Sequence, residues 1–184
     1  MGRGVMSQYT WETTFRQLFD RCVKLHRSGN SNHSSWFSPE DQAFLKSIGY
    51  TGQEFFDFVD DHCRYADGPT PETALLVASV RRDYLRTVQK GVTSTRTVPP
   101  SELPAKAAAV DGIPWLPRLI AKARAKLCGE MDADTMYGCG GDRAFLSEHD
   151  IHPADLLRVV WAAGGDDRKI IDYVKSGGTG HVVA

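Results

Sequence analysis

The chain contains one glycine-rich segment with a cysteine at its centre, directly before a predicted helix. It runs from Tyr137 to Arg143 with the sequence YGCGGDR. A glycine-rich approach to a helix N-terminus can present backbone N–H groups to an anion. A cysteine at such a helix end can also act as a nucleophile, because the positive end of the helix stabilises the thiolate. The segment therefore predicts an anion-binding turn or a nucleophilic site at Cys139.

A basic helix precedes this segment in the sequence. Arg118, Lys122 and Lys126 follow one another at four-residue steps, which places the three side chains on one helix face. Such a face could bind a phosphate, a carboxylate ligand or a nucleic acid. The alternative is a solvated face paired with nearby acidic residues such as Asp142. The candidate ligand-binding residues are Arg118, Lys122, Gly138, Gly140, Gly141, Asp142 and Arg143.

Catalysis at Cys139 would require partners for the thiol and for the substrate. Arg118 or Arg143 could hold an anionic substrate, and Tyr137 is the candidate proton donor, so the candidate catalytic residues are Cys139 and Tyr137. A single cysteine is also frequently a small buried apolar residue, and the segment can then be simple scaffold.

The sequence offers no pattern typical of a metal or cofactor site. Glu54, Asp57 and Asp61 share one helix face, but Glu-x-x-His pairs on two helices, which would complete a carboxylate metal centre, are missing. The HExxH, Walker, GxSxG and GxGxxG motifs are absent too. We therefore expect no metal and no cofactor.

Charge and hydropathy narrow the range of partners. The 184 residues include 22 Lys+Arg and 23 Asp+Glu, for a net charge of -1, and the charges are balanced within each half of the chain. This balance argues against a nucleic-acid partner. No apolar stretch approaches the roughly 20 residues of a membrane helix, so we expect no membrane partner.

The two ends and the cysteines point to a cytoplasmic location. The N-terminal sequence lacks the apolar core of a secretory signal. Four cysteines without paired spacing indicate reduced thiols rather than a disulfide framework.

Helix start and stop signals dominate the chain, and no convincing period-two strand is visible. Ser38-Pro39-Glu40-Asp41 and the capping box from Thr51 to Glu54 are typical helix starts. Glycines such as Gly49 and Gly129 follow apolar stripes as stop signals. The fold class predicted from these signals is all-α.

An internal repeat organises the predicted helices. Residues 41–60 align without gaps with residues 142–161 and are identical at five positions, among them Asp41/Asp142 and Phe44/Phe145. We therefore expect two tandem, related four-helix units that pack together about a pseudo-two-fold axis. The expected boundaries are an N-terminal unit 1–91, a Pro/Thr/Ala-rich linker 92–112, a C-terminal unit 113–176 and a flexible tail 177–184.

The second half also carries motifs of a known family. Residues 111–127, DGIPWLPRLIAKARAKL, together with Tyr137-Gly138-Cys139 and Asp142, resemble the bacterial domain-of-unknown-function 5069 family over about residues 111–175. The sequence departs from the family pattern at Ala121, where the family often has Asp, and at Gly140-Gly141, where it often has Pro-Leu. The resemblance implies a small bacterial helical protein and transfers no activity.

Three functions remain open at this point. The first is a binding module for a small anionic ligand or a protein partner. The second is a small enzyme that uses Cys139 as nucleophile, with Arg118 or Arg143 holding an anionic substrate. The third is a structural or assembly protein whose contact surfaces include Phe55-Phe56 and Trp161. The oligomeric state is open in all three cases.

Overall fold

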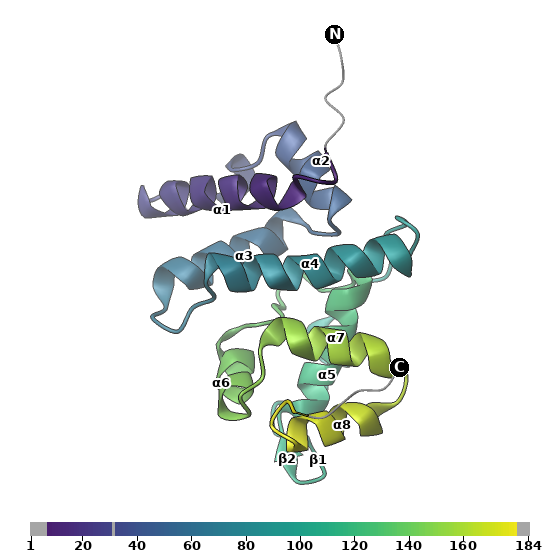
Figure 1. Cartoon of the computed structure of the whole chain (residues 1–184). Helices are drawn as coiled ribbons and strands as arrows, with labels where there is room; N and C mark the ends of the chain where they lie inside the picture. Colours follow the sequence, from purple (N-terminus) through teal and green to yellow (C-terminus); the bar gives the residue numbers. More distant parts are fainter. Residues whose placement is uncertain (1–6, 31, 180–184) are drawn as a thin grey trace. The chain divides into compact units, whose positions relative to one another are not determined.

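The computed structural model describes residues 7–30 and 32–179, and within these ranges it contains eight α-helices (Figure 1). The predicted predominance of helix is therefore confirmed. Residues 1–6 of the expected signal-free N-terminus and residues 180–184 of the expected tail lie outside the described residues. Across the described ranges, no helix combines the length and the apolar composition needed to cross a membrane.

The chain divides into two compact units, residues 1–78 and 79–184. The division falls inside the helix that closes the first run of helices. In chain order, the elements up to this point are α1 (Trp11–Arg27), the 3-10 turn η1 (His33–Ser35), α2 (Pro39–Ser47), α3 (Gly52–Arg64) and α4 (Pro71–Thr87).

The core of the first unit is aromatic. α1 packs against α3, and Phe15 and Phe19 of α1 meet Phe55 of α3 edge-on, with ring centroids 5.2 and 5.8 Å apart. Only 1% of Phe55 is exposed. The expectation that Phe55 belongs to an exposed contact surface is therefore wrong, because the α1–α3 packing takes this ring into the core.

The second unit begins with the end of α4 and continues through an irregular segment into four more helices. Its further elements are the 3-10 turn η2 (Pro100–Glu102), strands β1 (Ala109–Val110) and β2 (Ile113–Pro114), and helices α5 (Leu116–Cys128), α6 (Gly140–Glu148), α7 (Pro153–Ala163) and α8 (Asp167–Lys175). α7 packs against both α5 and α8, and fully buried leucines such as Leu119 and Leu156 fill the space between the helices.

A small hairpin in the second unit departs from the predicted all-α class. β1 and β2 pair antiparallel, with Ala109 opposite Pro114. The two residues between the strands, Asp111 and Gly112, have φ angles of 51° and 77°. Asp-Gly is a preferred dipeptide for a two-residue hairpin turn with positive φ at both positions. The Asp-Gly dipeptide therefore predicts this hairpin turn. An alternation of apolar and polar residues cannot show in strands of only two residues.

Helix boundaries recur at the spacing of the sequence repeat. α2 covers residues 39–47 and α6 covers 140–148, so both of their ends are displaced by the same 101 residues as the aligned sequences. The same displacement relates the starts of α3 and α7 at Gly52 and Pro153, and the ends of α1 and α5 at Arg27 and Cys128. Four helix ends of the first unit thus recur at the same spacing along the chain in the second unit.

The stability of the fold depends on pH through His152, the residue that caps the start of α7. His152 caps this helix, because its Nδ1 accepts a hydrogen bond from the backbone N–H of Ala154 at 3.1 Å. Burial lowers the pKa of His152 below its usual value of 6.5, although Asp155 acts in the opposite direction. The folded state therefore binds this proton less readily than the unfolded state. The resulting stabilisation is complete above the unfolded pKa and is lost as the pH falls through the lowered folded pKa.

We expect the urea midpoint of the protein to fall between pH ~7.5 and pH ~5, partly through His152. His152→Asn keeps a capping acceptor but does not titrate in this range, so its midpoint should fall less over the same interval. Urea unfolding of both proteins at both pH values measures the difference. Parallel declines in the two proteins would contradict this role of His152.

Candidate functional site

A buried ion pair joins two of the predicted site residues. Lys122 of α5 reaches Asp142 in the first turn of α6, with Nζ 2.5 Å from Oδ2, and the two side chains are 3% and 0% exposed. Lys126 is buried as well, with 1% exposed. The basic side chains of α5 therefore do not form a solvated ridge, because two of the three point into the second unit.

The Asp142 carboxylate accepts two further hydrogen bonds. The indole N–H of Trp115 donates to Oδ1 at 2.9 Å, and the backbone N–H of Gly138 donates to Oδ2 at 2.8 Å. A buried carboxylate without such partners would carry a large desolvation penalty. Together with Lys122, these donors hold the first turn of α6 against the start of α5.

Gly141 is required by the packing of Trp115. A Cβ atom at Gly141 would lie 2.5 Å from Cζ2 of the Trp115 ring, well inside contact distance. The backbone of Trp115 has a φ of 68°, a conformation that is costly for any residue with a Cβ. The indole ring is hydrogen-bonded to Asp142 in this position, and the absence of a Cβ at Gly141 leaves the room that the ring occupies.

Cys139 lies at the edge of the ion pair. It is the N-cap residue of α6 and is half-buried, and the Lys122 Nζ donates to its Sγ at 3.3 Å. The side chain makes no capping hydrogen bond to the described backbone of α6. Lys122 thus contacts an aspartate carboxylate and a thiol at the same time.

The remaining predicted residues surround this cluster with other contacts. The buried Tyr137 hydroxyl donates to the carbonyl of Pro153 at 2.7 Å, and burial raises the pKa of Tyr137 well above 10.0. Arg143 donates to the carbonyl of Gly138 at 3.0 Å, and Arg118 donates to the carbonyl of Pro104 at 2.8 Å. The structure therefore brings Lys122, Gly138, Cys139 and Asp142 into direct contact, with Arg143 beside them. The Tyr137 hydroxyl donates instead to the Pro153 carbonyl, and the Arg118 guanidinium donates to the Pro104 carbonyl.

The first unit contains a matching ion pair at the repeat spacing. Arg21 of α1 pairs with Asp41 of α2 at 2.6 Å, and these residues stand 101 positions before Lys122 and Asp142. Here the side chains are 45% and 22% exposed, and Ser38 caps α2 by accepting a hydrogen bond from the Asp41 N–H at 3.2 Å. Extending the sequence alignment upstream to Arg21 and Lys122 would have predicted both pairs.

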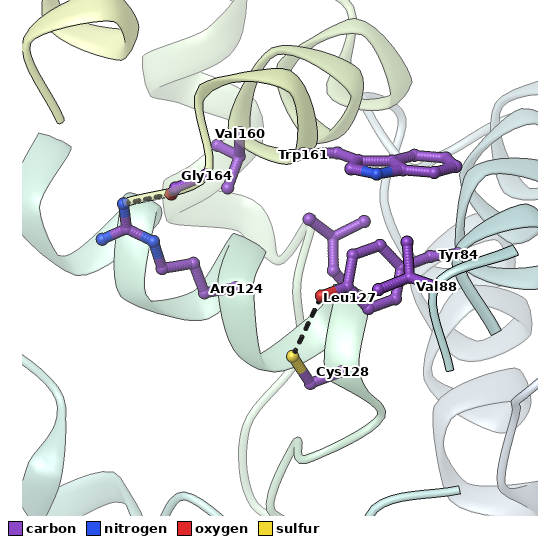
Figure 2. A pocket seen from close by; sticks show the side chains of 8 residues that line it. All are labelled: Tyr84, Val88, Arg124, Leu127, Cys128, Val160, Trp161 and Gly164. Carbon is purple, nitrogen blue, oxygen red and sulfur yellow. Dashed lines mark hydrogen bonds between the residues drawn. The ribbon is translucent and has the colours of Figure 1, made fainter. Parts of the chain in front are cut away.

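A cavity of about 360 Å³ in the second unit was not predicted from the sequence (Figure 2). It lies among the end of α4, α5 and the end of α7. Its lining residues are Tyr84, Val88, Arg124, Leu127, Cys128, Val160, Trp161 and Gly164. Three separate helices contribute, so only the packing of the helices reveals the cavity.

The two ends of this cavity differ chemically. At one end, the rings of Tyr84 and Trp161 meet edge-on with centroids 5.4 Å apart (Figure 2). At the other end, Arg124 donates to the carbonyl of Gly164 at 2.9 Å and pairs with Asp167 at 2.5 Å. The cavity therefore combines an aromatic wall with a guanidinium group.

Within residues 7–30 and 32–179, no group of three or more His, Cys, Asp or Glu side chains is placed to hold a metal ion.

The fold and the site define a mainly helical protein of two units, the second of which holds a buried lysine–aspartate pair beside a thiol. Residues 102–183 match the family model described as Domain of unknown function (DUF5069). This match confirms the predicted resemblance and extends from η2 to beyond the end of α8. No curated protein and no solved structure matches the chain.

Proposed function

We propose that this protein is a binding module for a small ligand that carries an aromatic ring and one carboxylate, and that the cavity of the second unit binds it. The observation that carries the proposal is the pairing of an aromatic wall, Tyr84 and Trp161, with the guanidinium of Arg124 in one cavity. Its volume of about 360 Å³ lies within the range typical of small-molecule sites.

The aromatic wall would supply most of the binding free energy. A ligand ring that packs against Trp161 and Tyr84 removes apolar surface from water and can adopt the edge-on or offset geometry that aromatic rings prefer. Val88, Leu127 and Val160 extend this apolar lining. A ligand without a ring would leave the wall in contact with water.

Arg124 would select an anionic ligand. A guanidinium binds a carboxylate through two parallel hydrogen bonds. Its present partner, Asp167, has a side chain that is 52% exposed, and an exposed ion pair of this kind contributes little free energy. A ligand carboxylate can therefore compete with Asp167 at a small cost.

This proposal places anion binding at Arg124 rather than at the glycine-rich turn. Lys122 already pairs with Asp142, and Arg118 and Arg143 donate to backbone carbonyls. An anion at the turn would have to replace these contacts. The enzyme with a Cys139 nucleophile and the assembly protein stay alternative predictions.

We also propose that the two units are related by duplication and that the protein works in a reducing compartment such as the cytoplasm. The matching helix boundaries and the matching Arg21–Asp41 and Lys122–Asp142 pairs support the duplication. The four cysteines, all within the described residues, are free, which supports a reducing location.

Titration calorimetry with four probes tests the proposed binding. Benzoate and phenylacetate should bind, whereas benzamide, which lacks the charge, and acetate, which lacks the ring, should bind much more weakly. Arg124→Gln should weaken phenylacetate binding about tenfold or more, because a hydrogen bond to a charged group is lost. Arg118→Gln removes an arginine from the same helix outside the cavity and should leave the affinity unchanged.

Chemical-shift mapping locates the bound probe. Phenylacetate should perturb the indole N–H resonance of Trp161 more than that of Trp115, which lies at the ion pair. Equal affinity of the wild type and Arg124→Gln for phenylacetate would overturn the proposal. So would a complete lack of binding by both aromatic carboxylates.

A further inference from the structure

The contact between Cys139 and Lys122 forms a second site that is independent of the cavity. We propose that Cys139 is oxidised by peroxide and that its sulfur then closes onto the Lys122 amine, forming a sulfur–nitrogen cross-link between α5 and the start of α6. The cross-link forms between these two side chains, and peroxide is the only other reactant.

The geometry suits a reaction between these two groups. Sγ and Nζ are 3.3 Å apart, so the atoms that would bond are already in contact. Lys122 is 3% exposed and is held in place by Asp142, while Cys139 is half-buried. Two reacting atoms held together in this way gain a large effective concentration.

The corresponding position of the first unit shows what a purely structural residue does there. Ser38, 101 residues before Cys139, caps α2 with its hydroxyl. Cys139 makes no such bond to the described backbone of α6 and contacts Lys122 instead. Losing a serine cap costs about 0.5–2 kcal/mol, so the cysteine is not explained by helix stability.

The proposed reaction balances in two steps. The Cys139 thiolate attacks one peroxide oxygen, an S–O bond forms, the O–O bond breaks, and the leaving hydroxide takes a proton from the Lys122 ammonium. Sulfur is oxidised by two electrons and the peroxide is reduced by two, giving a sulfenic acid and water. The neutral amine of Lys122 then attacks sulfur, an S–N bond forms, the S–O bond breaks, and hydroxide leaves with one amine proton as a second water.

Cys63 also has a cation beside its thiol, but this is the Arg27 guanidinium, which cannot form the lysine cross-link. Burial raises the pKa of Cys22 to about 12, and burial also raises the pKa of Cys63. Cys128 shares a hydrogen bond with the Tyr84 hydroxyl at 3.8 Å. The Lys122 ammonium beside Sγ can protonate the hydroxide that leaves from peroxide, so Cys139 should react first.

Peptide mass spectrometry of the full chain after hydrogen peroxide treatment tests the proposal. The Cys139 and Lys122 peptides should appear as one linked species that is lighter than their sum by two hydrogen atoms. Trypsin should no longer cut after Lys122, and a thiol reductant should restore both peptides.

Two variants separate the oxidation step from the cross-linking step. Each introduces the residue type that stands 101 positions earlier, in the first unit. Lys122→Arg keeps a cation beside Asp142, as Arg21 does beside Asp41, but cannot form this cross-link. It should stop at a sulfenic acid that dimedone traps on residue 139. Cys139→Ser should give neither product. Circular dichroism checks that both variants fold.

Two results would overturn the proposal. The first is oxidation of Cys139 no faster than that of Cys63 and Cys128 in the wild type. The second is a wild-type sulfenic acid at Cys139 that forms without any linked species. Neither result depends on ligand binding in the cavity, so this proposal and the proposed function fail separately.

Discussion

Asp142→Asn should lower the free energy of unfolding by about 3–5 kcal/mol, because it leaves the Lys122 ammonium buried without an opposite charge. The pair is 3% and 0% exposed, so water cannot take over the role of the carboxylate. Asparagine keeps only one oxygen, which can accept either from Trp115 at the Oδ1 position or from Gly138 at the Oδ2 position, so one lost hydrogen bond adds to the larger loss from the unpaired charge. Urea unfolding followed by circular dichroism measures the change.

The exposed ion pair of the first unit supplies a matched control for this prediction. Asp41→Asn removes the corresponding carboxylate of the first unit, whose Arg21 partner is 45% exposed. The loss there should be about 1 kcal/mol, since an exposed pair contributes little and asparagine can still accept at the helix start. Adding Lys122→Met to Asp142→Asn should recover part of the stability, because no buried charge remains. Equal losses in Asp41→Asn and Asp142→Asn would contradict the assigned role of burial.

Gly129→Ala should lower the free energy of unfolding by about 2–4 kcal/mol, through the backbone and through Arg81. Gly129 ends α5 with a φ of 70°, which is costly for alanine. The new Cβ would also lie 2.4 Å from Nη2 of Arg81. Arg81 is 1% exposed and donates to the Leu127 carbonyl at 2.8 Å and to Gln89 at 2.6 Å, so it cannot move aside without losing hydrogen bonds.

Gly91→Ala separates the two contributions to this loss. Gly91 also has a positive φ, of 81°, but no described atom lies within 4 Å of the position that its Cβ would take. The free energy of unfolding of Gly91→Ala should therefore fall only by the backbone cost of about 1–2 kcal/mol. Thermal and urea unfolding of both variants give the difference. Identical losses would mean that Arg81 accommodates the extra methyl group freely.

Local signals in the sequence were sufficient for the helices. The capping box from Thr51 to Glu54 is present as predicted, and the helix start predicted at Ser38 is a second capping box, which Asp41 completes. Gly129 ends α5 in the left-handed conformation that its position suggested. These features depend on hydrogen bonds within a few residues, so the sequence around each helix end contains the necessary information.

The environment of a side chain was much harder to predict. The four-residue spacing of Arg118, Lys122 and Lys126 correctly places them along one side of α5 but does not say which way that side faces. Basic residues are usually solvated, and the exception at Lys122 depends on Asp142, which lies 20 residues further along the chain.

The sequence by itself thus determined the helices and the family resemblance of the second half, because each depends on neighbouring residues or on a contiguous motif. The tertiary structure decided the burial of the lysine–aspartate pair, the contact of Lys122 with Cys139 and the cavity between Trp161 and Arg124. These features depend on how helices distant in the chain pack against one another, and packing selects which face of each helix leaves water.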